Sequence, residues 1–339
     1  MTTTKRGRTA LIGGAIAPFL VLTACGGDEA EPEGEGGDIE ITLAHSYTEQ
    51  QPQHRCGAQV IADEVASADV GVTVEVFPTS QLGEDADRIA SVVSGDIDMD
   101  IQGASALGAV YVPVSTLDAA YAFDDEEHYA RYFETEAAAE LLQGFADETG
   151  ITTLGSWTVG MRHFTANEPI REPADLDGLR MRFPDSPQFL MNAEALGADA
   201  TEVAYEELFL ALQQGTVDGQ ENPIVNIDAI SLDEVQDHLS LSGHGSNSNL
   251  VIIGEVWDEL SGEQQEVLQA AVDEAVAQVP GCVAEDEQKI LDGWEQDGAM
   301  KIVDDVDQAA FQEQALAYLQ ENLDEEQLAI FEGIRESAE

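Results

Sequence analysis

The sequence predicts an α/β protein made of two similar units, each built on a largely parallel sheet. Apolar and polar residues alternate in Ile39–Leu43 and again in Val70–Val76, as in half-buried strands. Between these strands, Gln53–Ala66 carries apolar residues at helical spacing, and the same alternation of strand and helix returns after Gly150. A chain of 339 residues that is 43% hydrophobic is long and apolar enough for two domains.

The first unit continues with a helix over Glu84–Ser94, which ends at a glycine, and a third strand over Asp98–Gln102. The acidic spacing of Asp96–Asp100 is similar to the start of a calcium loop. However, Ile101 stands where the loop needs a glycine, and Leu107 where it needs a bidentate glutamate. We therefore predict a strand here and no metal site.

The second unit is expected to contain strands near Ile151–Ser156 and Leu179–Arg182 and helices over Pro187–Leu196 and Tyr205–Gln214. The segment Val217–Pro223 combines a glycine turn signal with amide and carboxylate side chains before a proline. This composition predicts a loop.

The C-terminal part is predicted to be helical. From Ser261 an apolar stripe at helical spacing runs toward Trp294 and is interrupted by a Pro-Gly pair at 280–281, which indicates one long, bent helix that crosses the protein. Two amphipathic helices, Gln308–Glu321 and Asp324–Ser337, close the chain. We find no repeat of the solenoid type.

The N-terminus has the features of a secretory leader, which we place at residues 1–24. A short basic region precedes the apolar stretch Ala10–Leu22, which is shorter than the roughly 20 residues that a membrane span needs. The ending Leu22–Cys25 resembles a bacterial lipobox, in which Cys25 becomes the lipid-modified first residue at the outer face of the cell membrane. The alternative is an ordinary cleaved signal with an incidental cysteine. Residues 25–38 are rich in Gly and Glu and predict a flexible tether.

Cys56 and Cys282 then remain as an even pair in an exported protein. A disulfide between them is the default expectation for an oxidising compartment, and two buried free thiols are the alternative.

The charge of the chain restricts its partners. It has 68 acidic residues against 13 basic ones and a formal net charge of −55. Binding to nucleic acid needs a basic face, which this composition does not supply. Self-repulsion of this size is tolerated best in high salt, where the Debye length falls to roughly 3 Å at 1 M, so we expect a saline habitat.

Against this acidic background four arginines gather in one short stretch, where an anion could be held: Arg162, Arg171, Arg180 and Arg182. We expect this stretch and Val217–Pro223 to form opposite walls of one binding site.

An ordered series of motifs in this region has a recognisable family pattern. The series is Pro78–Gly83, Gly160–Arg162, Asp175–Pro184, Ala195–Ala198, Ala211–Gly215, Asn222–Pro223, Glu234–Gln236 and Leu239–His244. It resembles the DctP-like solute-binding proteins of TRAP (tripartite ATP-independent periplasmic) transporters, and the resemblance covers essentially all of the mature chain. Pro52–Gly57 and Gly243–Asn249 depart from the commonest family sequence and leave the distal end of the ligand unspecified.

The resemblance implies a two-domain fold of the periplasmic-binding-protein (Venus flytrap) type, in which a cleft separates the domains and a long helix spans both. The corresponding boundaries are 39–159 plus 248–287 for the first domain and 160–247 plus 288–339 for the second.

The resemblance also implies a set of ligand contacts. Arg182 matches the family's principal substrate arginine and Arg162 its second arginine. Asn222 and Tyr205 match further contact positions, while Gln81, Gln102 and His45 fall near cleft-facing positions with weaker correspondence.

The physical chemistry agrees, because a guanidinium presents a rigid fork that fits a carboxylate. The alternative for Arg182 and for Arg162 is an internal salt bridge, and for Tyr205 a core position. Arg171 and Arg180 are expected to contact only solvent or acids.

We therefore expect a solute-binding protein that captures a small carboxylate by hinge closure and delivers it to a TRAP membrane permease. No cofactor is expected. Catalysis is unsupported, because the six histidines show no metal spacing and no nucleophile elbow occurs. The alternatives are a binding protein for ectoine or a similar compatible solute, or a surface-tethered sensor of the same fold. Trp157 could contact such a ligand or lie in the core.

Overall fold

The computed structural model describes residues 39–338, which belong to one compact unit, 37–339. The predicted leader, the tether and Cys25 lie outside the described residues. Within residues 39–338, no helix is both long and apolar enough to cross a membrane.

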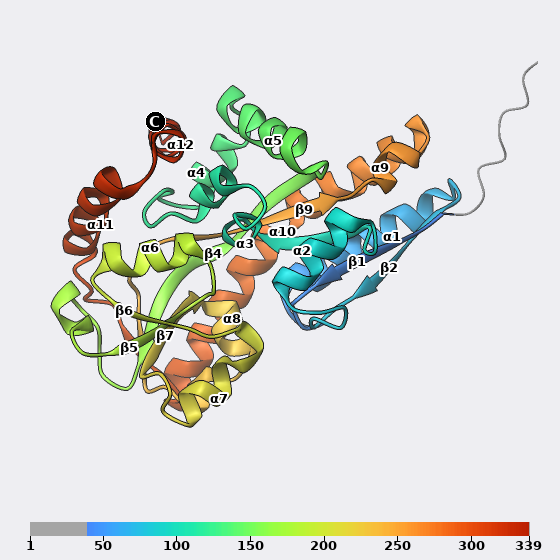
Figure 1. Cartoon of the computed structure of the whole chain (residues 1–339). Coiled ribbons are helices and arrows are strands. Elements are labelled where there is room, and N and C mark those ends of the chain that lie inside the picture. The colour runs from blue at the N-terminus through green and yellow to red at the C-terminus, as the bar shows by residue number, and fades with distance from the viewer. Residues whose placement is uncertain (1–38, 339) are drawn as a thin grey trace, which may run out of the picture. The chain divides into compact units, whose positions relative to one another are not determined.

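The described chain alternates strands and helices, which confirms the predicted α/β class (Figure 1). The strands are β1 Ile39–His45, β2 Val72–Phe77, β3 Met99–Gly103, β4 Thr152–Ala166, β5 Arg180–Phe183, β6 Asp199–Glu202, β7 Gly219–Pro223, β8 His238–Ser240, β9 Ser246–Ile253 and β10 Lys301–Val303. The α-helices are α1 Gln59–Ala68, α2 Asp85–Ser94, α3 Ala104–Leu107, α4 Glu126–Tyr132, α5 Glu136–Thr149, α6 Pro187–Leu196, α7 Leu208–Gln213, α8 Ile224–Ala229, α9 Val256–Glu259, α10 Gly262–Asp297, α11 Gln308–Asn322 and α12 Glu325–Glu336. Short non-α turns are η1 Gln53–Ala58, η2 Val112–Asp118, η3 Pro173–Leu176, η4 Tyr205–Glu207 and η5 Leu232–Glu234.

The strands form a path in the order β2-β1-β3-β9-β4-β7-β5-β6, and β8 joins β4 to β10 beside it. The outer pairs are parallel: β1 with β2 and β3, and β5 with β6 and β7. The middle is antiparallel, because β9 pairs with β3 and β4, and β4 pairs with β7. The sheet is therefore mixed where the sequence predicted it to be largely parallel, since the two long strands β4 and β9 return through its centre.

Strand β4 is longer than the predicted strand Ile151–Ser156 and runs for 15 residues. It links the strands on the side of β1 to β3, here called the first set, with those on the side of β5 to β7, the second set. It carries a register shift against β9 between Thr158 and Met161, at Gly160, whose φ is +95°. A bulge of this kind bends a strand and redirects its side chains. Residues after Gly160 pair with β7 and β8, so the bend delivers Arg162 to the second set.

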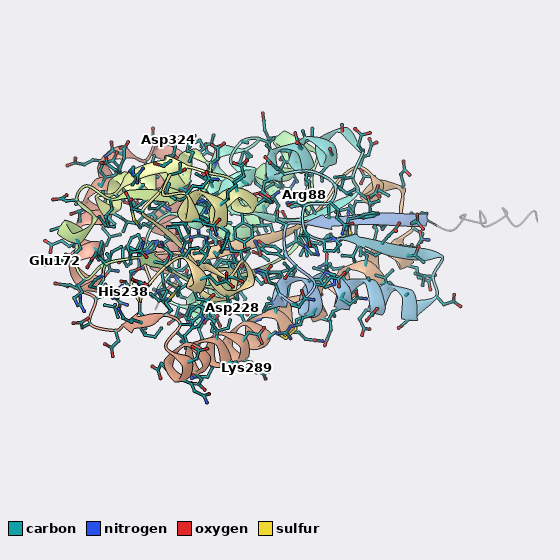
Figure 2. All side chains as sticks on the ribbon, turned by 90° about the horizontal axis from the view of Figure 1, so that it is seen from below. Arg88, Glu172, Asp228, His238, Lys289 and Asp324 are labelled. Carbon is teal, nitrogen blue, oxygen red and sulfur yellow. A yellow bond between two sulfur atoms is a disulfide. The ribbon has the colours of Figure 1, made fainter. Side chains whose placement is uncertain are left out.

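Helix α10 is the long helix that the sequence predicts, and it continues through Pro280 for 36 residues. It packs against β4, η1, α1 and α8, and Figure 1 shows it, in orange, running along β4. The close approach requires Gly155 on β4, because an added Cβ would lie 2.7 Å from a methyl group of Val272. Cys56 in η1 and Cys282 in α10 form a disulfide, drawn in yellow in Figure 2.

One predicted element is wrong. Gly219–Pro223, the core of the expected loop, is the fully buried strand β7 between β4 and β5. Burial between two strands overrides the turn signals of Gly219 and Pro223, which stand at the ends of the strand. The arginine-bearing strands and this segment are therefore neighbours in one sheet, and they form one wall of the site where opposite walls were expected.

Three clusters of buried apolar residues form the core. One lies between β1, β3, β9, α1 and α10, a second under α4, α5, α6, α11 and α12, and a third around α7, α8 and the end of α10. Trp157 is 1% exposed within the first cluster, so it occupies the core position that was its alternative. The domain boundaries given above stay a prediction.

Candidate ligand-binding site

A cavity of about 450 Å³ lies among the residues that follow the ends of the strands. Its volume is in the range that small-molecule sites occupy. Five of the predicted contacts line it: Arg162, Arg182, Tyr205, Asn222 and Gln102. Gln81 and His45, the remaining two, are absent from the lining.

The Arg162 side chain is 2% exposed and is already paired within the protein. Its Nε and Nη2 donate to the carboxylate of Glu221, with Nη2 2.7 Å from Oε1, and Nη1 donates to Asn247. Its guanidinium carbon also lies 4.5 Å from the ring centre of Phe189. The internal salt bridge considered for Arg162 is therefore present, and the same side chain lines the cavity.

Strand alternation explains this pairing. Phe164 pairs with Glu221 across β4 and β7, and Arg162 lies two residues before Phe164 on the same face, within diagonal reach of Glu221. Burial alone would raise the pKa of Glu221, but the charge of Arg162 and hydrogen bonds from His244 and Arg162 hold this pKa below its usual value.

His244 completes the group from the segment before β9. Its Nε2 lies 3.2 Å from Glu221 Oε2, and its Nδ1 lies 2.8 Å from the Ser242 hydroxyl. Burial lowers the pKa of His244, so the ring is neutral, Nε2–H donates to the carboxylate and Nδ1 accepts from Ser242. The ring also stacks on Phe164, with ring centres 4.3 Å apart.

Arg182 on β5 differs from Arg162 in one decisive respect. It is also 2% exposed, but within the described part of the chain its only hydrogen bond runs from Nε to the carbonyl oxygen of Val203, at 2.8 Å. Its terminal nitrogens Nη1 and Nη2 have no hydrogen-bond partner among residues 39–338. Burial lowers the pKa of Arg182 to about 10, with Glu221 raising it and Arg162 lowering it further. The guanidinium is thus charged at neutral pH, lines the cavity and presents an open pair of donors.

Asn222 and Tyr205 line the cavity through side chains that are held by the protein. The Asn222 amide donates to Gln220 at 2.6 Å and accepts from Arg162 at 3.3 Å. The Tyr205 hydroxyl donates to the carbonyl oxygen of Asn226 at 3.1 Å, so it is neither free nor simply part of the core.

The weaker candidates separate in the structure. Gln102 lines the cavity, but its amide donates to Asp100 and accepts from the backbone of Gly103. Gln81 is exposed in the turn after β2. His45 is fully buried, and both its ring nitrogens are engaged, by the backbone of Tyr47 and by His54.

Arg171 and Arg180 make the acid contacts expected of them. Arg171 donates to Asp305 at 2.8 Å, and Arg180 donates to Asp218 at 2.6 Å and 2.8 Å; both arginine side chains are about half exposed, at 45% and 51%. Neither lines the cavity.

The sequence did not indicate a group of polar residues that line the cavity from several elements: Tyr47, Asn226, Asn249 and Asn247, which accepts from Arg162. The polar, small character of Gly243–Asn249 was the one signal available. Among residues 39–338 there is no group of three or more His, Cys, Asp or Glu side chains placed to hold a metal ion.

Comparison with known proteins gives a consistent result. The sequence profile of the family described as bacterial extracellular solute-binding protein, family 7 (DctP), matches residues 43–326. A solute-binding protein of Roseobacter denitrificans is 30% identical over 317 residues, which cover 93% of this chain and 96% of that protein. The C4-dicarboxylate-binding periplasmic protein DctP of Rhodobacter capsulatus is 31% identical over 300 residues, 87% of this chain and 86% of that protein.

Solved structures share the fold. A TRAP periplasmic solute-binding protein from Roseobacter denitrificans with bound L-galactonate has a TM-score of 0.82 and 31% identity, and the match covers 88% of this chain and 99% of that chain.

Proposed function

The chain belongs to family 7 of the bacterial extracellular solute-binding proteins, and from this premise we propose that it captures a small organic acid outside the cytoplasm for a TRAP-type permease. Its α/β fold with one long helix is that of the family's periplasmic-binding proteins, as the sequence predicted. Solute binding is the activity that the description of this family supports.

The observation that carries the proposal is the open guanidinium of Arg182. Its Nε is fixed on Val203, while the two terminal nitrogens lack a protein partner among residues 39–338 and belong to a cavity-lining side chain. A carboxylate can accept from both terminal nitrogens at once, and such charge-assisted pairs are the strong ones. An unpaired buried cation is costly, so a bound anion relieves that cost.

The relatives support an organic acid as the ligand. The C4-dicarboxylate-binding protein of Rhodobacter capsulatus is named for its dicarboxylate, and the structure from Roseobacter denitrificans holds L-galactonate. This favours an organic acid over the ectoine-type solute considered above, although both carry a carboxylate.

Capture by closure is supported by a contact between Ser80 and the cavity-lining residue Glu206. The Ser80 hydroxyl, in the turn after edge strand β2, donates to the carboxylate of Glu206, in η4 after edge strand β6. The loops after the two ends of the strand path thus meet, which is the contact that a closing hinge would make and release.

We further propose that residues 1–24 are removed on export and that Cys25 is lipid-modified, so that the protein is anchored at the outer face of the membrane beside its permease. Metabolic labelling with a fatty acid tests the anchor: Cys25→Ser should lose the label and appear in the medium. A labelled Cys25→Ser variant would overturn the anchor without touching the ligand site.

A thermal-shift screen in high salt tests the ligand class. Ligands that bind the folded state raise the melting temperature by mass action. We expect hydroxy acids, sugar acids or dicarboxylates to raise it, and carboxylate-free polyols and amines to leave it unchanged. A broad panel of carboxylates without any response would reject the proposed function.

A further inference from the structure

A second buried pair of arginine and carboxylate lies on α2 and β3, and neither residue lines the cavity. The side chain of Arg88, labelled in Figure 2, is 1% exposed, and the side chain of Asp100 on β3 is fully buried. Arg88 Nε lies 3.2 Å from both carboxylate oxygens of Asp100. A buried cation and a buried anion hold each other in place, because either charge alone would be costly to bury. Asp100 therefore anchors the Arg88 guanidinium to the sheet.

The remaining nitrogens of Arg88 contact the turn 78–83, which connects β2 to α2, and the start of α2. Nη1 donates to the carbonyl oxygen of Gly83 at 2.9 Å and to the hydroxyl of Ser80 at 3.4 Å. Nη2 donates to Asp85 at 2.8 Å. All three nitrogens of the guanidinium are thus used in different directions, which the single ammonium group of a lysine cannot reproduce.

The backbone of this turn is strained. Thr79 and Ser80 have φ values of +57° and +52°, in the left-handed region that residues other than glycine rarely adopt. Their backbone N–H groups donate to the carbonyl oxygens of Tyr47 and His45, at 2.9 Å and 3.0 Å. Such a conformation persists only where its surroundings impose it, and it is typical of functional segments. These backbone contacts and the side chain of Arg88 together hold the turn.

The hydroxyl of Ser80 connects Arg88 to the contact with Glu206. A hydroxyl has one proton, and the carboxylate of Glu206 only accepts, so Ser80 donates this proton to Glu206. The N–H of Arg88 only donates, so it uses a lone pair of the same Ser80 oxygen. The two hydrogen bonds therefore run in one direction, from Arg88 through Ser80 to Glu206. Donation by a cation polarises the hydroxyl and strengthens its bond to the carboxylate.

We propose that Arg88 is a positioning residue for ligand capture: anchored on Asp100, it sets the turn 78–83 so that Ser80 meets Glu206 when the cavity closes. This inference rests on the proposed function and assigns part of the closing motion to a buried side chain outside the cavity lining. If Arg88 only attached α2 to β3, its replacement would lower the stability of the fold, and any effect on binding would be independent of Glu206.

Stopped-flow dissociation of L-galactonate from the purified protein in high salt tests the inference. Arg88→Lys keeps a positive charge beside Asp100 but loses the fork that reaches the turn. The dissociation rate should therefore rise about 2- to 10-fold, because the hydrogen bond to Glu206 is weakened. Arg171→Lys is the matched control, since it makes the same exchange at an exposed pair with Asp305 that does not line the cavity, and it should leave the rate unchanged.

The combination of Arg88→Lys with Glu206→Ala separates positioning from a general structural effect. Without the Glu206 carboxylate, Ser80 has no acceptor to reach, so adding Arg88→Lys should leave the dissociation rate of Glu206→Ala unchanged. Rate increases that multiply in the double variant would show that Arg88 acts independently of Glu206 and would overturn the inference. A folded Arg88→Lys variant that releases L-galactonate at the parent rate would overturn it as well.

The design also separates failure of the inference from failure of the proposed function. If the parent protein does not bind L-galactonate, the same variants are measured with the carboxylate that raises the melting temperature most. If the parent binds no carboxylate of the panel, the proposed function fails and this inference fails with it. If Arg88→Lys does not fold, Arg88→Met with Asp100→Asn takes its place, because it removes the buried cation and anion together, and the same rate increase is expected.

Discussion

The carboxylate of Glu221 occupies two nitrogens of the Arg162 guanidinium, so the two cavity arginines are not equivalent. Both are buried to the same degree, at 2% exposure, yet Arg182 keeps its terminal nitrogens open. Arg162 therefore stabilises the sheet, whereas Arg182 can hold a ligand.

This division predicts different effects on stability. Arg162→Met should lower the free energy of unfolding by about 3 to 5 kcal/mol, because Glu221 would stay buried without its partner. Arg182→Met should change it by no more than about 1 kcal/mol, since it removes one hydrogen bond together with an uncompensated cation. Urea denaturation of the ligand-free variants in high salt measures both. Similar losses in the two variants would mean that Arg182 is as firmly paired as Arg162. In a further control, Arg162→Met with Glu221→Met should recover part of the loss.

Only part of this site could be predicted from the sequence. Arg182, Arg162 and Asn222 lie in motifs whose residue order is visible along the chain. The pairing of Arg162 with Glu221 depends on the register of β4 against β7 and on the bend at Gly160, and neither follows from local pattern. His45 was expected near the cleft from its weak correspondence to a cleft-facing family position, but its buried ring contacts His54.

The fold was predictable where a periodic pattern is long. The helices α2, α6, α11 and α12 begin and end within two residues of their predicted bounds. The one failed element has a physical cause, since tertiary packing overrides local signals. β7 is buried between two strands despite its turn residues. Helix α10, which the sequence predicts as one long helix, continues through Pro280.

The buried His45 should make stability dependent on pH. Burial first, and the nearby His54 and Arg88, lower its pKa to about 3 from the ordinary 6.5, so the unfolded chain takes up the proton first. The contribution of neutral His45 is therefore complete above pH 6.5 and is lost progressively as the pH falls toward 3. His45→Gln should remove a slope of about 1.4 kcal/mol per pH unit in this window, relative to the parent. Urea titrations between pH 7 and pH 4 measure the difference, with His238→Gln, a half-buried histidine on β8, as control. Parallel profiles of His45→Gln and the parent would contradict this account.

The disulfide should contribute substantially to stability. Cys56 and Cys282 are 226 residues apart in sequence, and closing a long loop restricts the unfolded chain. The double variant Cys56→Ser with Cys282→Ser should lose about 2 to 5 kcal/mol of unfolding free energy. Denatured, unreduced protein should show no free thiol from these two positions. Two reactive thiols would mean that the bond does not form in the cell.

The contact between Ser80 and Glu206 should affect closure of the cavity. Its removal should leave the contact between Arg182 and the ligand carboxylate unchanged. Glu206→Ala should weaken carboxylate binding about 2- to 10-fold, mostly through faster dissociation, because an exposed hydrogen bond contributes about 0.5 to 1.5 kcal/mol. Its neighbour Glu207→Ala, which also lines the cavity, should leave the rate unchanged. Stopped-flow dissociation measures both. Equal rates in the two variants would remove this contact from the closing motion.

The central claim is that Arg182 holds the carboxylate, and calorimetry on two variants of the same strand tests it most directly. With the carboxylate that stabilises the protein most in the thermal screen, Arg182→Ala should weaken binding by about 2 to 5 kcal/mol. Arg180→Ala, which removes an exposed arginine paired with Asp218, should bind as the parent does. Arg182→Ala that is folded and binds as tightly as the parent would contradict the account.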